Sequence, residues 1–202
     1  MINNFDLIAG YLEFELPTDF YFLQILQRKK DNNNCVVSSN YRVIKSYYIY
    51  SIEELYRRKD KIIELCNNNN ARAYIWLNPR NTVDVSFECI RQFTDLLQNN
   101  NTDMCYRVFD RACGKIIKRG VTKTWIVDID EDTMPFYEDI YNIINSCKGN
   151  HVYHIRLSLP TKHGAHLITE GFDKEEFERK CKEAGIPKLD IHKDNPTNLY
   201  IP

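Results

Sequence analysis

Trp125-Ile126-Val127-Asp128-Ile129-Asp130 is an apolar segment that ends in two acidic residues. Successive side chains of a β-strand point to opposite faces, so Asp128 and Asp130 share one face while Val127 and Ile129 point into a core. Two neighbouring carboxylates repel each other unless a cation neutralises them. Mg²⁺ and Mn²⁺ prefer such oxygen ligands, so the segment predicts a strand that ends at a metal site. The alternative is a strand that runs out into an acidic, solvated turn, which caps the helix that begins near Met134.

Outward from this segment, strand and helix patterns alternate. After residue 120 we expect strands at 124–130, 151–159 and 165–169, helices at 134–147 and 173–184, and a strand or hairpin from 188 to 201. Before it we expect strands at 20–28, 41–50 and 71–77 and helices from a Ser51 cap to Cys66 and over 83–98, with 104–120 open between helix and loop. This alternation predicts an α/β or α+β fold around a central sheet. We treat residues 1–202 as a single domain, in which 1–120 could form an N-terminal lobe against the motif-bearing part 121–202.

The charge balance is almost neutral, with 27 Lys and Arg against 28 Asp and Glu in 202 residues. Binding to nucleic acid would therefore have to rest on a local basic face. The seven cysteines include no CxxC pair, and no leader precedes the polar start. We therefore expect reduced thiols, several of them buried, and a cytoplasmic protein. No apolar run approaches the ~20 residues that span a bilayer, and we expect no membrane partner.

Two further motifs follow the acidic strand. The stretch from Leu159 to His166 contains a small, basic turn with Thr161, Lys162, His163 and Gly164. Such a turn between two strands can direct backbone N–H groups, a lysine and an imidazole toward a phosphate. Downstream, Leu189-Asp190 places a third carboxylate in a strand that a polar turn follows.

In this order the motifs resemble those of the archaeo-eukaryotic primase, or primase-polymerase, superfamily, and they are similar to the polymerase domains of bacterial end-joining ligases. The family's first motif, an apolar strand ending in D-x-D, matches Asp128-Ile129-Asp130. Its second, a small residue, any residue and His, matches Gly164-Ala165-His166, and its third, an apolar residue before Asp, matches Leu189-Asp190. Thr161 and Lys162 stand where relatives often carry Ser and Gly, and residues 1–120 carry no motif that we match.

The resemblance implies an RRM-like mixed or antiparallel sheet with helices packed on it, plus an N-terminal α/β lobe. It also implies a metal-dependent nucleotidyltransferase, a DNA-directed primase or polymerase that uses a 3′-hydroxyl to attack a nucleotide α-phosphate. Asp128, Asp130 and Asp190 would be the catalytic acids and would hold two ions of Mg²⁺ or Mn²⁺.

His166, Lys162 and Gly164 would lie at the nucleotide phosphates, with His163 and Lys193 as weaker candidates. The implied partners are nucleoside triphosphates, single-stranded or primed nucleic acid, and a helicase or other replication protein.

Other functions remain open from the sequence. Cys147, His151 and His154 could suggest zinc, although a spacing of three on a strand puts the two histidines on opposite faces. The chain could be a catalytically inactive member of the same fold that binds nucleic acid or a replication partner. It could also be a metal-dependent nuclease, because acids and a histidine serve hydrolysis equally well.

Overall fold

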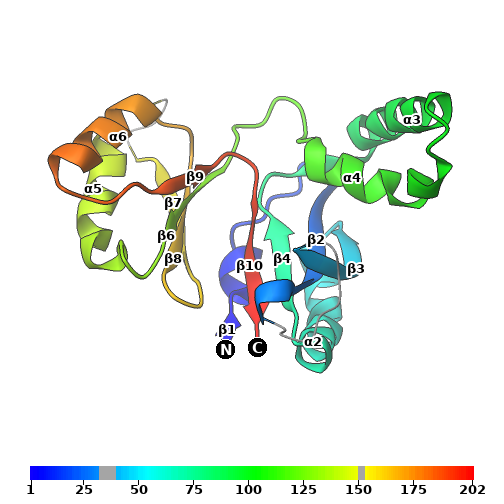
Figure 1. Ribbon diagram of the computed structural model, residues 1–202, viewed down its shortest axis with the longest axis horizontal. Helices are drawn as coiled ribbons and strands as arrows, with labels where there is room; N and C mark the ends of the chain where they lie inside the picture. Colours follow the sequence, from blue (N-terminus) through cyan, green and yellow to red (C-terminus); the bar gives the residue numbers. More distant parts are fainter. Residues whose placement is uncertain (32–39, 150–152) are drawn as a thin grey trace. The chain divides into compact units, whose positions relative to one another are not determined.

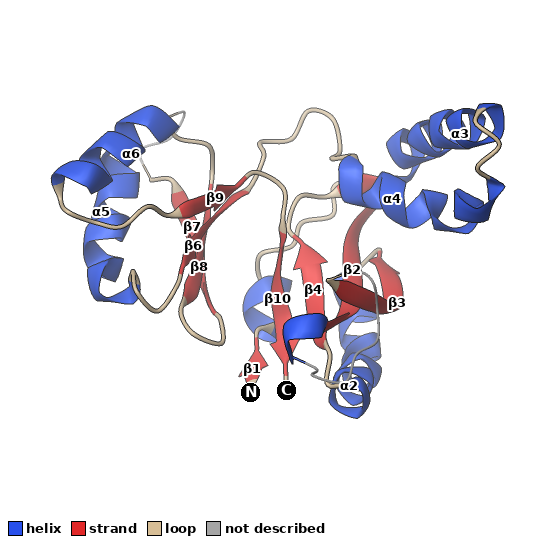
Figure 2. Ribbon diagram, viewed as in Figure 1, coloured by secondary structure: helices blue, strands red, loops and turns tan. Residues whose placement is uncertain are grey.

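Helices and antiparallel sheets make up the chain in the computed structural model, which describes residues 1–31, 40–149 and 153–202 (Figures 1 and 2). The α+β class expected from the sequence is confirmed. The chain divides into two units, which we call the motif unit and the second unit. The motif unit joins residues 1–11 to residues 122–201, and the second unit contains residues 12–121 and Pro202. The first eleven residues thus belong with the motifs rather than with residues 12–120, with which the expected N-terminal lobe 1–120 joined them.

The motif unit is built around a four-stranded antiparallel sheet. Its elements are β1 (Ile2–Asn3), α1 (Phe5–Ala9), β6 (Trp125–Ile129), the 3₁₀ helix η3 (Met134–Phe136), α5 (Tyr137–Ser146), β7 (Ile155–Pro160), β8 (Ala165–Thr169), α6 (Lys174–Glu183), β9 (Asp190–His192) and β10 (Pro196–Ile201). The sheet order is β7-β8-β6-β9. The succession β6-α5-β7-β8-α6-β9 with this order is the split β-α-β arrangement of ferredoxin-like folds.

One face of this sheet carries the apolar core of the motif unit. Val127 and Ile129 are fully buried there, as the alternation predicted, together with Leu167 of β8. Ile140 and Ile144 of α5 and Phe177 and Cys181 of α6 pack on the same cluster, and Figure 2 shows both helices beside the sheet. The acidic positions of β6 therefore face away from the helices.

The segment from 188 to 201 forms two strands with different partners. β9 pairs with β6, whereas β10 pairs with β1 at the start of the chain. Between these strands the chain leaves the four-stranded sheet, so this segment is not a hairpin.

Asn4 fixes the N-terminal segment to the sheet. Its side chain is fully buried and donates to the carbonyl of Pro160 at 3.1 Å and to that of Asn198 at 2.8 Å. Its backbone N–H donates to the carbonyl of Leu199 at 2.9 Å. One residue thus ties the end of β7 to β10.

The second unit has a sheet in which β2 lies between β3 and β4. Its elements are β2 (Asp19–Arg28), the 3₁₀ helix η1 (Lys29–Asp31), β3 (Tyr41–Ile49), α2 (Ile52–Asn69), β4 (Arg72–Trp76), β5 (Arg80–Asn81), α3 (Thr82–Gln98), the 3₁₀ helix η2 (Thr102–Arg107) and α4 (Val108–Lys115). The hydroxyl of Ser51 accepts from the N–H of Glu54 at 3.1 Å, which confirms the predicted cap. Phe20 and Phe22 of β2 pack against Val85 of α3 and Val108 of α4.

Five of the six described cysteines are buried, as expected, and all six are free thiols. Burial raises the pKa of the Cys66 thiol to about 12 and that of Cys181 to about 11. Within the described residues, no helix combines the length and the apolar character that crossing a membrane requires.

Candidate active site

The three motif strands bring their polar residues into one row. On β6, Asp128 lies directly opposite His166 of β8 on one side and Asp190 of β9 on the other. Residues that face each other across antiparallel strands project their side chains to the same face, with Cβ atoms about 4.5–5.5 Å apart. The side chains of His166, Asp128 and Asp190 therefore lie next to one another, on the face of the sheet that points away from α5 and α6.

His166 is held at both ring nitrogens. Its Nε2 lies 3.3 Å from Oδ1 of Asp128, and its Nδ1 lies 2.8 Å from the hydroxyl of Thr197. The side chain of His166 is 12% exposed and that of Asp128 is 28% exposed, while Thr197 of β10 is fully buried. Thr197 thus fixes the orientation of the imidazole, and its other nitrogen lies beside the partly exposed carboxylate of Asp128.

Gly164 brings the β7–β8 turn against the end of β6. A Cβ atom added to Gly164 would stand 1.8 Å from the carbonyl oxygen of Ile129 and 3.3 Å from the Cα of Asp130. The N–H of Thr161 donates to the carbonyl of Gly164 at 2.9 Å, and the N–H of Gly164 donates to the Thr161 hydroxyl at 3.1 Å. Only glycine allows the two backbones to come this close. The second motif therefore needs a small residue at position 164 for a steric reason.

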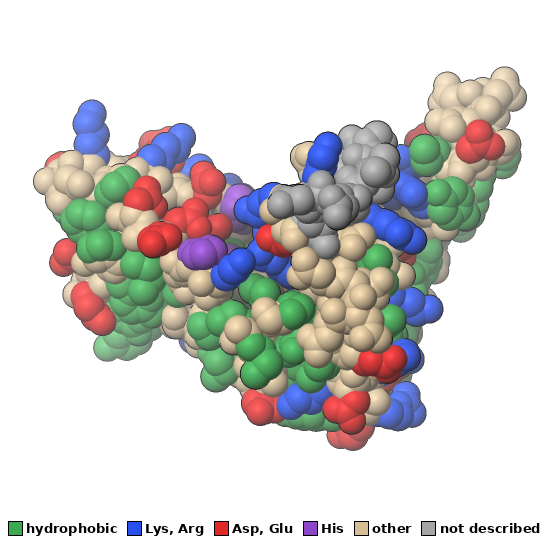
Figure 3. All heavy atoms as spheres, turned by 60° about the horizontal axis from the view of Figure 1, so that its bottom comes forward, with side chains coloured by type: hydrophobic (Ala, Val, Ile, Leu, Met, Phe, Trp, Pro, Cys, Tyr) green, Lys and Arg blue, Asp and Glu red, His purple; other side chains and the backbone are tan. Residues whose placement is uncertain are grey.

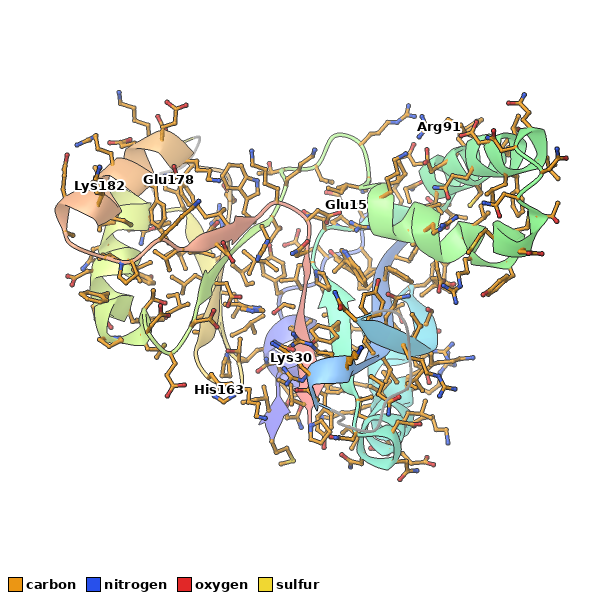
Figure 4. The ribbon with its side chains drawn as sticks, in the orientation of Figure 1. Glu15, Lys30, Arg91, His163, Glu178 and Lys182 are labelled. Atoms are coloured by element: carbon orange, nitrogen blue, oxygen red, sulfur yellow. The ribbon has the colours of Figure 1, made fainter. Side chains whose placement is uncertain are left out.

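The remaining residues of this turn are exposed. Lys162 and His163 lie at its tip, where Figure 4 shows His163 at the end of the β7–β8 hairpin. Nδ1 of His163 lies 3.9 Å from a carboxylate oxygen of Glu131, a loose approach between two exposed side chains. Both basic residues can therefore reach an anion beside Asp130.

Asp130 and Asp190 are both exposed, at the end of β6 and at the start of β9. The backbone carbonyl of Asp130 accepts from the N–H groups of Thr133 and Met134, at 3.1 and 2.9 Å. No side-chain hydrogen bond caps η3 among the described residues. The Asp130 carboxylate is thus not used as the helix cap that the alternative interpretation required.

Lys193 lies farther along the sheet. Its Nζ stands 4.7 Å from the centroid of the Trp125 ring, at the other end of β6 from Asp130. A cation over an aromatic face is a favourable contact in its own right. The structure therefore places Lys193 with Trp125, three residues before Asp128 in the strand, and separate from the β7–β8 turn.

The donor chemistry of the row fits a hard divalent cation, because Asp128, Asp130 and Asp190 supply carboxylate oxygens. Within the described residues, however, no three His, Cys, Asp or Glu side chains are grouped as a metal site. The backbone brings the three acidic residues to one region of the sheet. Because Asp130 and Asp190 are exposed, their side chains could rotate to bind an ion beside Asp128.

Cys147 and His154, the two described residues of the zinc alternative, each have a hydrogen-bond partner within the protein. His154 is buried, and its Nε2 lies 2.9 Å from the backbone carbonyl of Cys147. The thiol of Cys147 donates to the carbonyl of Ile143 at 3.1 Å. His151 lies outside the described residues.

The two units carry opposite formal charge. The motif unit contains 10 Lys and Arg against 15 Asp and Glu, a net charge of −5, and the second unit contains 17 against 13, a net charge of +4. Figure 3 shows acidic side chains gathered near histidines in the left part of the view. The almost neutral total thus combines an acidic unit with a basic one.

Thr197 and Asn4 are the residues of this site that the sequence did not reveal. Thr197 contacts a histidine 31 residues earlier, and Asn4 contacts Pro160 and Asn198, which are 156 and 194 residues away. Neither belongs to a local motif.

Comparisons with protein-family models, with curated proteins and with solved structures found no match for this chain.

Proposed function

We propose that this chain is a metal-dependent nucleotidyltransferase of the primase-polymerase type. The observation that carries the proposal is the register of the sheet, in which Asp128 stands between His166 and Asp190. Three separate stretches of sequence thereby converge on one face. The backbone contact of Gly164 with Ile129 supports the same interpretation, because it brings the basic turn to the end of the acidic strand.

In the proposed reaction, the 3′-hydroxyl of a primer or initiating nucleotide attacks the α-phosphate of an incoming nucleotide, and pyrophosphate leaves. Mg²⁺ or Mn²⁺ held by Asp128, Asp130 and Asp190 would lower the pKa of the attacking hydroxyl and balance the charge of the triphosphate. The protein would contribute to catalysis by positioning the reactants and by stabilising the charge on the phosphates, the two effects that dominate catalysis of phosphoryl transfer.

His166 and the turn would bind the triphosphate. With its Nδ1 held by Thr197, the imidazole directs Nε2 toward Asp128, and a proton on Nε2 can be donated to a phosphate oxygen placed beside that carboxylate. Lys162 and His163 are exposed at the tip, where Lys162 adds positive charge and the His163 ring adds a hydrogen-bonding group at the same end of the sheet.

We assign nucleic-acid contact to the second unit on the basis of its charge. Its net charge of +4 favours contact with phosphates more than the net charge of −5 of the motif unit does. Binding by this surface would weaken as salt is raised, because phosphate contacts release counterions.

A catalytically inactive module of the same fold is the second candidate. The observation in its favour is that the described side chains are not grouped as a three-ligand metal site and that Asp128 faces His166. Such a module would bind nucleotide or nucleic acid without turnover.

The test is incubation of the purified protein with Mn²⁺ or Mg²⁺, a single-stranded template with and without primer, and labelled nucleotides. De novo product indicates a primase, and extension of the primer alone indicates a polymerase. Asp128→Asn, which keeps the size of the side chain, is expected to lower the rate by about 10²–10³-fold or more. Asp132→Asn is the matched control, because Asp132 is an exposed acid of the same turn that lies outside the motif.

Each other outcome contradicts the proposal in a different way. A degraded template indicates a nuclease, and bound nucleotide without turnover indicates the inactive module. Equal loss of activity in Asp128→Asn and Asp132→Asn would show that general negative charge, rather than the aligned row, supports the reaction.

A further inference from the structure

Helix α3 of the second unit is apolar on two faces. The inner face buries the apolar Val85 and Cys89 together with Glu88, whose carboxylate is paired with Arg91 and Lys115. The outer face exposes an apolar stripe. Its members and their exposed fractions are Val83 (53%), Phe87 (64%), Ile90 (63%), Phe93 (41%) and Leu97 (59%). The outer face of a surface helix is ordinarily charged or polar, so a helix that is apolar on both sides indicates a missing partner.

The stripe is continuous and free of charge. At 3.6 residues per turn, its five apolar residues and the intervening Ser86 and Thr94 lie within an arc of about 120°. No charged residue falls inside this arc. In Figure 3, hydrophobic side chains reach the surface in the right-hand part of the view, where α3 and α4 lie.

The two hydroxyls within the stripe are turned back onto their own helix. Ser86 donates to the carbonyl of Thr82 at 2.8 Å, and Thr94 donates to the carbonyl of Ile90 at 2.9 Å. Since these hydroxyls already have acceptors, covering them costs less than burying unpaired polar groups. The outer face of α3 is therefore prepared for an apolar contact along its whole length.

We infer that the outer face of α3 binds the same face of a second copy of this chain, with the two helices antiparallel. The stripe is symmetric about Ile90, because Phe87 and Phe93 lie three residues to either side of it and Val83 and Leu97 lie seven residues to either side. A two-fold axis at Ile90 then sets Val83 against Leu97 of the other copy and Phe87 against its Phe93. A self-complementary patch is what an isologous dimer contact requires.

The size of the stripe agrees with a modest dimer. Its 17-residue helix is about 25 Å long. With aromatic side chains that bury about 150–250 Å² each when fully covered, two stripes together remove on the order of 1,000 Å² from water. That area lies near the lower limit of specific interfaces, so we expect a dimer that dissociates on dilution.

The charges beside the stripe do not oppose this contact. Arg91, labelled in Figure 4, pairs with Glu88 of the same helix. Glu88 also accepts from Lys115 at 2.9 Å, and Asp84 pairs with Arg119 at 3.2 Å. Arg91, Glu88 and Asp84 therefore already have partners within their own copy.

The test is sedimentation velocity of the full chain over a range of concentrations. We expect a monomer–dimer equilibrium for the wild type, and a rise of about 100-fold or more in the dissociation constant for the double variant Phe87→Lys, Ile90→Lys. Both positions are exposed, so the fold is retained, which circular dichroism checks. Leu7→Lys is the matched control, because Leu7 is an exposed apolar residue of α1, and it should dimerise like the wild type.

A cross-link gives a second, independent measurement. Ile90→Cys places a thiol at the proposed axis and should form a covalent dimer under mild oxidation, whereas Asp95→Cys, on the same helix outside the stripe, should not. A wild-type chain that stays monomeric at about 100 μM, or a dimer that survives the lysine pair, would overturn the inference. This result is independent of nucleotide transfer, because it is read without substrate.

Discussion

The carbonyl oxygen of Ile129 and the α-carbon of Gly164 lie so close that a Cβ atom on Gly164 would stand 1.8 Å from that oxygen. Ile129 is paired with Ala165, the residue after Gly164, so neither backbone can withdraw without disturbing the β6–β8 register. This contact connects the second motif to the first through backbone atoms alone.

Gly164→Ala should therefore disturb the turn and the end of β6 together. We expect a loss of about 1–3 kcal/mol in the free energy of unfolding, measured by urea denaturation, because the added methyl group overpacks a rigid contact. Gly114→Ala is the control, since nothing lies within 4 Å of a Cβ there and the residue is helical. It should be neutral or stabilising by up to about 1 kcal/mol. Equal effects of the two changes would contradict the steric explanation.

Thr197 should act on nucleotide use through His166. Thr197→Val keeps the shape of the side chain but removes the hydroxyl that lies 2.8 Å from Nδ1. If the proposed function holds, we expect kcat/KM for the nucleotide to fall about tenfold, which is the value of one lost hydrogen bond. Thr197→Ser, which retains a hydroxyl, should restore most of the activity. Equal losses in the two variants would indicate a packing role for Thr197.

The sequence predicted those parts of the fold that depend on local periodicity. β6, β8 and α6 have the positions that alternation and helical spacing indicated, and Ser51 forms the cap of α2. The inward side chains Val127 and Ile129 followed from the period of two. These features are encoded within a few residues, so no long-range information was needed.

Features that depend on contacts between distant residues could not be predicted. Nothing near Thr197 or Asn4 in the sequence indicates their partners, because the partners are brought by β8 and by the end of β7. Lys193 follows Asp190 by three residues, yet it stacks on Trp125, since β9 runs antiparallel to β6.

Asn4 should matter for stability far more than its place near the chain start suggests. Asn4→Ala removes two hydrogen bonds from a fully buried donor, and the carbonyls of Pro160 and Asn198 lose this partner. We expect a loss of about 2–3 kcal/mol in the free energy of unfolding. Asn142→Ala, at an exposed position of α5, should change it by less than about 0.5 kcal/mol. A loss in Asn4→Ala no larger than in Asn142→Ala would show that Asn4 does not fix the N-terminal segment.

Asp19 gives the second unit a stability that depends on pH. Burial acts to raise the pKa of this carboxyl, but hydrogen bonds from Lys118 at 2.6 Å and from Asn81 at 2.9 Å outweigh burial and lower the pKa below its ordinary value of 3.8. A group whose pKa is lowered by folding stabilises the folded state above its unfolded pKa, and this contribution is lost as the pH falls through the folded pKa.

Asp19→Asn should therefore destabilise the protein most at neutral pH. Because the side chain of Asp19 is 1% exposed and that of Lys118 is 10% exposed, removing one charge leaves a largely buried lysine with weaker compensation, a loss of about 3 kcal/mol near pH 7. The difference from the wild type should begin to shrink below about pH 4, where the unfolded carboxyl takes up its proton, and should vanish as the pH falls through the lower pKa of the folded carboxyl. Urea denaturation between about pH 2 and pH 7 measures this difference. Asp139→Asn, at an exposed position of α5, should follow the wild type throughout, and a difference for Asp19→Asn that does not change with pH would contradict the ion pair as its source.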